Sequence, residues 1–491
     1  MTRIMMKQGS KVLAPCAFVV VICSGGIGTE IPSTALHIQL TTKKSATVEP
    51  DALIATGLKT PVRVGPAAES RVKWWREARF GMFIHFGVYA IPGCGEWVKW
   101  NQSIPHSEYA KLADQFTPDP EAPKRWAELA KQAGMKYVVL TARHHDGFSL
   151  FDSRANAFNS VQTAAKTDIV RTFTDAVRNQ GLRVGLYYSP LDWRFPGYFM
   201  PDLYRESAEA MREQYPQEMQ QLSTEYGHLD LIWYDGGGER WLGFGGLDRD
   251  ANGWKRRAKD KPYKGKFSWR DDEVNTALRQ QHPAILINDR TSSVADWRTR
   301  EGKAALGDFE GREPWELCYT VAGGWGYTAN AKPRSLSELV VLLTNTVSRD
   351  GNMLLNIGPD PQGSVPPDQV ARLLEVGEWL KSYGAAIYRT RGGPFLPTLQ
   401  VTSTRRGNRV YVHILPDESG GLPRVVNIPR FESGPELKSA QLLATGSPVS
   451  WRAAGAQLEI DVPDPSDGSP TQVIELAYNG SVMDLAPLHL P

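Results

Sequence analysis

Short apolar runs alternate with amphipathic helical stretches from residue 74 to about residue 390, and this alternation restricts the fold more than any other feature of the chain. Seven runs have the composition of buried strands, at residues 81–86, 136–141, 183–188, 229–234, 284–288, 317–320 and 353–357. Helical stretches lie between them at residues 123–134, 168–181, 204–226, 271–281 and 335–349. Repeated units of this kind predict an α/β fold with a TIM-like (β/α)₈ barrel, although no clean strand and helix can be assigned at residues 315–335.

A second pattern begins after residue 390. Short, often alternating runs separated by Gly, Pro, Asp and Ser occur at residues 399–401, 409–415, 424–428, 440–443, 457–462 and 472–477. This pattern predicts antiparallel sheet, most simply a β-sandwich. We therefore expect a catalytic (β/α)₈-like barrel at residues 71–390 followed by a C-terminal antiparallel β-sandwich at residues 391–491.

The N-terminal residues have the order of a targeting segment. Within residues 1–28, basic residues come first, then about a dozen apolar residues, then small ones. This order predicts a signal peptide, and the apolar part is too short for a stable membrane anchor. Residues 29–70 are rich in Thr, Ser, Ala and Pro without periodicity, which indicates a linker or N-terminal arm. We expect a secreted or periplasmic protein, with no membrane association after signal removal.

The overall composition excludes some partners and leaves others open. A formal charge of +2 gives no support for a nucleic-acid partner. Fifteen tryptophans are many, and aromatic faces stack well on sugars, but large barrels also bury many tryptophans. Beyond the predicted signal only Cys94 and Cys318 remain. Two free buried thiols are the simpler interpretation, because nothing in the sequence brings the two cysteines together.

One carboxylate stands at the end of the most strongly apolar run. Asp235 follows residues 229–234 and precedes three glycines. In isolation, an Asp that opens a Gly-rich turn is a common structural feature. Trp233 lies two residues earlier and, because side chains alternate along a strand, it shares a face with Asp235. This pairing favours an aromatic platform beside a functional carboxylate.

Polar residues also follow the other predicted strands, whose ends converge on the catalytic face of a barrel. They are His85, His144-His145-Asp146, Tyr187-Tyr188 and Asn288-Asp289-Arg290. No His-x-His, His-Glu-x-x-His or Cys pair completes a metal shell, so we expect no metal and no cofactor. The histidines are then either ligands for hydroxyl groups or a structural pair. Arg290 either lowers the pKa of a carboxylate or closes a structural salt bridge.

Taken in order, these segments resemble the α-L-fucosidases of glycoside hydrolase family 29. The motifs that carry the resemblance are FGMFIHFG (80–87), Glu96-Trp97, YVVLTARHHDGF (137–148), GLYYS (185–189), LIWYDG (231–236), NDR (288–290) and GNMLLNIGP (351–359). They cover about residues 70–390, and the His-His-Asp-Gly-Phe and Trp-x-Asp-Gly segments are the most specific. A C-terminal β-sandwich also fits the usual architecture of that family.

The resemblance implies a retaining, exo-acting hydrolase of terminal α-L-fucosides, with a fucosylated oligosaccharide or glycoconjugate as its partner. Asp235 matches the nucleophile of the family. The residues that match its substrate contacts are His85, Glu96, Trp97, His144, His145, Tyr188, Trp233 and Arg290. Before the resemblance is considered, Glu96-Trp97 has an equally plain interpretation as a solvated Glu beside a rim Trp.

The acid/base has four candidates: Glu301, Glu310, Glu313 and Glu316. Residues 296–301 resemble the Asp-aromatic-x-Thr-x-Glu stretch that supplies the acid/base in bacterial relatives, which favours Glu301. Trp315-Glu316 resembles a separate motif of the family and makes Glu316 the second candidate. Gly302 departs from the family pattern, in which many members continue with an extended polar loop.

Two other functions remain as alternatives. The first is hydrolysis of a related sugar such as an α-L-galactoside, which differs from a fucoside in carrying a C6 hydroxymethyl group instead of a methyl group. The second is a non-catalytic carbohydrate-binding protein on the same fold. An insertion at residues 239–269 contains several aromatic and basic residues. It forms either a subsite for the leaving group or a lid or packing element.

Overall fold

The structure is a computed structural model that describes residues 66–236, 247–250, 253–256, 267–302, 309, 313–432, 434–466 and 468–491. Every described residue belongs to one unit, Leu53–Pro491. The predicted signal peptide, most of the predicted arm, most of the 239–269 insertion and Glu310 lie outside the described residues.

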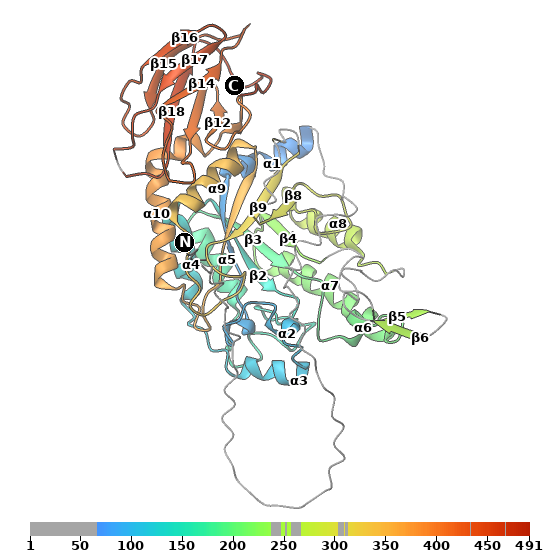
Figure 1. Cartoon of the computed structure of the whole chain (residues 1–491). Coiled ribbons are helices and arrows are strands. Elements are labelled where there is room, and N and C mark those ends of the chain that lie inside the picture. The colour runs from blue at the N-terminus through green and yellow to red at the C-terminus, as the bar shows by residue number, and fades with distance from the viewer. Residues whose placement is uncertain are drawn as a thin grey trace, which may run out of the picture. The chain divides into compact units, whose positions relative to one another are not determined.

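Parallel strands form one eight-stranded sheet in the order β7-β4-β3-β2-β1-β10-β9-β8. Figure 1 labels β2, β3, β4, β8 and β9 of this sheet. The strands are β1 (Phe80–Ile84), β2 (Tyr137–Arg143), β3 (Arg183–Tyr188), β4 (Leu231–Tyr234), β7 (Leu286–Ile287), β8 (Arg298–Glu301), β9 (Trp315–Thr320) and β10 (Asn352–Ile357). A parallel bridge between Asn288 and Trp297 links the two edge strands. The backbone N–H of Asp296 also donates to the carbonyl of Ile287 at 2.7 Å. The predicted TIM-like barrel is confirmed.

Strand β8 is the element that the apolar pattern misses. Its sequence, Arg-Thr-Arg-Glu, contains no apolar residue, and all four side chains are half-buried. A strand of this composition is held by its pairing with β9, in which Arg298 lies opposite Trp315 and Glu301 opposite Cys318. Apolar periodicity therefore finds the strands that bury both faces and overlooks the one that carries polar side chains into the barrel.

The longer helices alternate with the strands, and the first and the last of them are not among the predicted helical stretches. These longer helices are α1 (Pro66–Ala78), α4 (Ala122–Gln132), α5 (Ile169–Asn179), α7 (Arg205–Glu225), α8 (Asp271–Gln281), α9 (Leu336–Ser348) and α10 (Pro367–Tyr383). Side-chain caps begin two of them: Asp168 accepts the N–H of Arg171 at 2.9 Å, and Ser335 accepts that of Glu338 at 3.1 Å. None of the helices in the described part of the chain has the length and apolar character that a membrane span requires.

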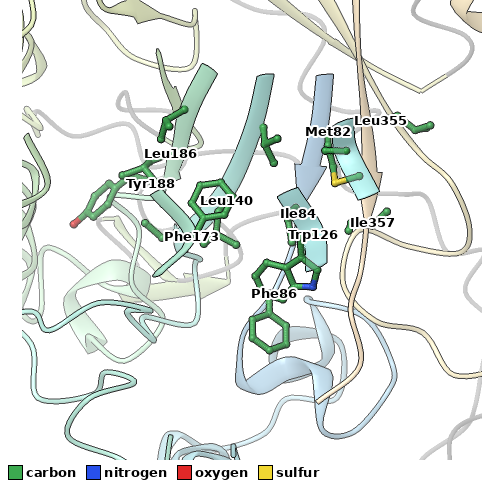
Figure 2. Packing of buried hydrophobic residues seen from close by; sticks show 14 of the residues in the cluster. Met82, Ile84, Phe86, Trp126, Leu140, Phe173, Leu186, Tyr188, Leu355 and Ile357 are labelled. Atoms are coloured by element: carbon green, nitrogen blue, oxygen red, sulfur yellow. The ribbon is translucent and has the colours of Figure 1, made fainter. Parts of the chain in front are cut away.

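Alternation along the strands separates two hydrophobic clusters. Side chains on the outer faces, such as Met82, Ile84 and Leu186, pack in the larger cluster with residues of the helices (Figure 2). Inward-facing side chains, such as Phe83 and Trp233, form a second cluster inside the barrel. Parity along each strand therefore decides whether a side chain supports the fold or lines the interior.

The C-terminal strands form two antiparallel sheets, in the orders β11-β12-β13-β18-β15 and β14-β17-β16. Their bounds are β11 (Arg391–Gly392), β12 (Val401–Arg406), β13 (Arg409–Ile414), β14 (Val425–Pro429), β15 (Leu437–Leu442), β16 (Trp451–Ala454), β17 (Gln457–Asp461) and β18 (Gln472–Tyr478). Apolar residues from both sheets share one cluster, for example Val412 and Ile460. This arrangement confirms the predicted β-sandwich.

Candidate active site

Asp235 stands where β4 ends. Its backbone N–H donates to the carbonyl of Tyr188 at 3.1 Å, so pairing with β3 continues to this residue. Gly236 follows with φ +83°, and a Cβ there would lie 2.4 Å from a carbon of Leu191. A glycine is required at that turn. The chain therefore turns away directly after Asp235 and leaves its carboxylate at the carboxyl end of the barrel.

Three side chains approach the carboxylate of Asp235. The hydroxyl of Tyr187 donates to Oδ2 at 2.9 Å, Nη1 of Arg290 donates to Oδ1 at 3.1 Å, and Nε2 of His145 lies 3.4 Å from Oδ2. Burial alone would raise the pKa of Asp235. The hydrogen bond and charge of His145, the charge of Arg290 and the hydrogen bond of Tyr187 together lower that pKa to about 2. Asp235 is therefore ionised at neutral pH, as a carboxylate nucleophile must be.

Glu301, the last residue of β8, shares a cation with Asp235. Nη2 of Arg290 donates to Oε1 of Glu301 while Nη1 donates to Asp235. Nε of the same arginine donates to Oγ1 of Thr299 at 3.0 Å, which ties it to β8. The side chains of Arg290, Glu301 and Asp235 are 12%, 14% and 15% exposed. One guanidinium thus holds two accessible carboxylates at a single site.

The structure does not bring Tyr188 to Asp235 with the other predicted residues. Tyr188 faces outward from β3, where it packs with Leu186 in the larger hydrophobic cluster (Figure 2). Its hydroxyl donates to Oε2 of Glu218 at 2.7 Å. Adjacent residues on a strand point to opposite faces, so only one of the two tyrosines enters the barrel. That residue is Tyr187, whose hydroxyl binds Asp235.

Two of the acid/base candidates lie away from the site. Glu316 is 0% exposed, and its carboxylate accepts the hydroxyl of Tyr137 and, at 3.1 Å, the indole N–H of Trp233. No leaving group can reach it. Glu313 precedes β9 at the opposite end of the barrel and binds Nε of Arg298 at 2.8 Å. Glu310 lies outside the described residues. Among the described candidates, Glu301 is the one that contacts the partners of Asp235.

His85 is oriented by a residue that the sequence does not single out. Its Nδ1 lies 2.7 Å from Oδ1 of Asn356, whose Nδ2 donates to the carbonyl of Trp325 at 2.7 Å. Because the amide nitrogen is committed to a carbonyl, the amide oxygen faces His85 and accepts its Nδ1–H. Burial lowers the pKa of His85 to about 4. The ring is therefore neutral, with Nε2 left as a hydrogen-bond acceptor.

Both histidines of the His-His-Asp segment reach the site because they follow Arg143, where β2 ends. The rings of His144 and His145 lie 4.2 Å apart, and that of His144 stacks on Tyr187 at 5.7 Å and 13°. Burial lowers the pKa of His144 well below its usual value, and the neighbouring His145 adds to this effect. Nδ1 of His144 has no partner among the described residues. A neutral imidazole can donate one hydrogen bond to a sugar hydroxyl and accept another.

Glu96 and Trp97 approach the same centre from the loop after β1. Oε2 of the buried Glu96 accepts the N–H of Gly326 at 2.6 Å, which ties this loop to the loop after β9. The half-buried ring of Trp97 lies edge-on to His145 at 5.5 Å and tilted against Trp193 at 4.9 Å. These contacts place both residues at the rim of the site.

Four residues of the site are not among the predicted catalytic residues and substrate contacts: Tyr187, Trp193, Trp325 and Asn356. Each contacts a predicted residue, through Asp235, Trp97 or His85. Trp325 belongs to the Gly-rich segment at residues 315–335, where the strand and helix pattern fails. A Trp inside a Gly-rich turn after a barrel strand is the signal that could have found it.

Within the described part of the chain, no three His, Cys, Asp or Glu side chains are placed to hold a metal ion together. The expectation of a site without metal or cofactor stays a prediction. Cys94 is half-buried and Cys318 is buried.

Two carboxylates joined by one arginine, at the carboxyl end of a (β/α)₈ barrel and ringed by histidines and aromatic side chains, define a glycoside hydrolase. Residues 65–385 match the family model described as alpha-L-fucosidase. The chain belongs to the α-L-fucosidase family, as its motifs imply.

Known relatives match most of the length of the chain. An alpha-L-fucosidase of Dictyostelium discoideum is 29% identical, over 81% of this chain and 90% of that protein. The tissue alpha-L-fucosidase of Macaca fascicularis is 32% identical, over 71% and 77%. Among solved structures, alpha-L-fucosidase isoenzyme 1 from Paenibacillus thiaminolyticus is similar with a TM-score of 0.69 and 31% identity, over 84% of this chain and 100% of that chain.

Proposed function

We infer that this chain is a retaining, exo-acting α-L-fucosidase that removes terminal α-L-fucose from fucosylated oligosaccharides or glycoconjugates. Membership of the family supports the substrate. The observation that carries the mechanism is the single guanidinium of Arg290, which contacts both Asp235 and Glu301. The basic-then-apolar order of residues 1–28 supports export, to the periplasm or out of the cell.

In the first step, Asp235 attacks the anomeric carbon while Glu301 gives its proton to the departing glycosidic oxygen. The product is a β-fucosyl-enzyme ester. In the second step, Glu301 takes a proton from water, which attacks the same carbon, releases Asp235 and restores the α configuration. The contact between Glu301 and Arg290 suits the ionised form that this second step needs. Retaining pairs lie about 5–5.5 Å apart and inverting pairs about 6.5–9.5 Å, and a shared guanidinium favours the closer arrangement.

Recognition of the sugar combines polar and apolar walls. His85 and His144 present neutral imidazoles for ring hydroxyls. The half-buried ring of Trp325 lies 5.4 Å from that of His85 and offers an apolar surface for the C6 methyl group of fucose. An α-L-galactoside carries a hydroxymethyl group at this position. Aryl glycosides of both sugars, assayed side by side, decide between them.

The decisive experiment replaces the nucleophile. Asp235→Gly should lower turnover of an aryl α-L-fucoside by at least about 10³-fold, because the covalent route is lost. Azide should restore part of the rate and yield the β-L-fucosyl azide, and wild-type enzyme should release α-L-fucose first, both followed by NMR. Asp230→Gly is the matched control: this residue precedes the same strand at its amino end, where it accepts the N–H of Val184 at 2.8 Å. It should keep turnover per folded molecule and gain nothing from azide. Normal hydrolysis by Asp235→Gly, or β-L-fucose from the wild type, would overturn the proposal.

A further inference from the structure

Glu316 is a carboxylate inside the barrel that the mechanism does not use. It is the second residue of β9, and its side chain is 0% exposed. Oε2 accepts the hydroxyl of Tyr137, and Oε1 accepts the indole N–H of Trp233 at 3.1 Å. The indole N–H groups of Trp75 and Trp297 also face this carboxylate and lower its pKa. Neither is close and straight enough to count as a hydrogen bond. Glu316 is thus surrounded by hydrogen-bond donors.

These donors come from separate elements that meet inside the barrel. Tyr137 begins β2, Trp233 lies on β4, Trp75 on α1, and Trp297 precedes β8. A Cβ at Gly81 would lie 2.5 Å from the ring of Tyr137, so the missing side chain on β1 makes room for this ring. Two titratable groups among the described residues lie beside the carboxylate, the phenol of Tyr137 and the buried thiol of Cys318 on β9. No cation is among these neighbours.

Trp233 connects this buried group to the catalytic residues. Its ring stacks on that of Tyr187, with centroids 5.7 Å apart and an angle of 18°. The guanidinium carbon of Arg290 lies 5.5 Å from the centroid of the same ring, within cation–π distance. Tyr187 and Arg290 are also two of the three groups that approach Asp235. One indole ring therefore supports both.

We propose that Glu316 is a positioning residue of the fucosidase reaction: by accepting the indole N–H of Trp233, it fixes the ring that supports Arg290 and Tyr187 and so orients Asp235. This role rests on the assignment of Asp235 as the nucleophile. The N–H is the one polar group of an indole. With its acceptor removed, the N–H is buried without a partner, which favours rotation of the ring and displaces the groups stacked on it.

Stability alone does not explain a carboxylate at this position. Burial raises the pKa of Glu316 to about 7, even though the hydrogen bonds from Tyr137 and Trp233 lower it. A buried ionisable group carries a desolvation cost that an apolar side chain of similar volume would avoid. The hydrogen bond to Trp233 supplies a functional reason for the carboxylate.

The pH profile of activity separates a positioning role from a structural one. If Glu316 only stabilises the fold, its replacement lowers the folded fraction and leaves the shape of the kcat/KM profile unchanged. If Glu316 positions Trp233, its replacement loosens Arg290 and Tyr187, and the pKa of Asp235 rises. Activity requires ionised Asp235, so the acid limb of the profile then moves to higher pH.

The test compares Glu316→Met, Glu316→Gln and wild type on an aryl α-L-fucoside across the acid range, in short assays with folding checked by circular dichroism at each pH. Glu316→Met removes the acceptor and should move the acid limb up by about one pH unit, since an adjacent cation lowers a carboxyl pKa by about 1–3 units. Glu316→Gln keeps an oxygen for Trp233 and an N–H for the hydroxyl oxygen of Tyr137. It should restore the wild-type limb.

Glu218→Met is the matched control. Glu218 is equally buried and accepts the hydroxyl of Tyr188, but it lies on the outer side of β3. Its replacement should lower thermal stability and leave the acid limb in place. If Glu316→Met does not fold, Trp233→Phe removes the same N–H and should give the same shift. If the acid limb of the pH profile does not move in the folded variants, the positioning role is overturned. If the wild type does not hydrolyse the fucoside, the proposed function itself is overturned.

Discussion

Two carboxylates at different levels of one barrel have opposite pKa shifts. Asp235 stands at the mouth and Glu316 below it, on either side of Trp233. Burial acts on both in the same direction, yet it leaves Glu316 at about 7 while Asp235 falls to about 2. The difference lies in the partners. Asp235 is approached by Arg290 and His145, whereas Glu316 receives hydrogen bonds from uncharged donors, which do not offset its loss of hydration.

The comparison shows why the pKa of a carboxylate and its access to the substrate must be considered together. One carboxyl group with a low pKa and one with a high pKa is the usual pattern of a nucleophile and a general acid. Here that pattern selects Glu316, which no leaving group can reach. Glu301 is 14% exposed and contacts the arginine that binds Asp235. Access to the substrate, and not the pKa alone, decides the role.

The largest effect should come from the proposed acid/base, Glu301. Glu301→Gln should slow hydrolysis of natural fucosides by about 10²–10⁴-fold, because general acid–base catalysis contributes about that much. The loss should be milder with activated aryl leaving groups, which depart without a proton. Steady-state rates on a series of aryl α-L-fucosides of graded leaving-group pKa measure the difference.

Glu316→Gln is the matched variant in that series. It should show no dependence on the leaving group, because Glu316 is closed off from the glycosidic oxygen. If Glu316→Gln shows the leaving-group dependence and Glu301→Gln does not, the two roles must be exchanged. That result would also contradict the burial of Glu316.

The next prediction concerns the pH dependence of stability, which has opposite signs for Glu316 and Asp235. The folded pKa of Glu316, about 7, lies above its ordinary value of 4.5. Its contribution to stability is therefore complete below about pH 4.5 and is lost as pH rises through 7. This amounts to about 3 kcal/mol, at 1.36 kcal/mol per pKa unit. Asp235 behaves conversely: its folded pKa of about 2 lies below 3.8, so its contribution is lost as pH falls through that range.

Urea unfolding of wild type and Glu316→Gln from pH 4.5 to 8 measures the first of these windows. The stability of the wild type relative to the variant should decrease as pH rises. A difference that does not change with pH would show that Glu316 has the same pKa in the folded and the unfolded protein. The comparison between the two carboxylates would then rest on geometry alone.

Much of this architecture is predictable from sequence. Strands buried on both faces have continuous apolar runs, so seven of the eight barrel strands are found, and turn residues mark the sandwich. Asp235 and Arg290 are found because polar residues follow strands whose ends meet at one face of a barrel. Glu301 is found by its motif, since β8 itself has no apolar pattern.

The sequence does not give the register of the strands or the position of each side chain along the barrel axis. Glu301 and Glu316 both belong to barrel strands with polar or mixed composition, and only the structure shows that one ends its strand at the mouth while the other begins its strand below. Tyr187 and Tyr188 raise the same problem. Alternation states that one of them faces inward, but the choice depends on the pairing of Tyr187 with Trp233 across β3 and β4.

These two tyrosines offer the smallest and most closely matched test. Tyr187→Phe removes a hydrogen bond to the ionised carboxylate of Asp235 and should lower kcat/KM about 10-fold, consistent with about 1.5 kcal/mol for such a bond. Tyr188→Phe removes an equivalent bond to Glu218 on the outer face, so it should lower the thermal midpoint and leave kcat/KM unchanged. Because the residues are adjacent, equally buried and changed in the same way, only the face of the strand differs between them. A loss of activity in Tyr188→Phe without a loss of stability would return Tyr188 to the site and show that the strand is turned the other way.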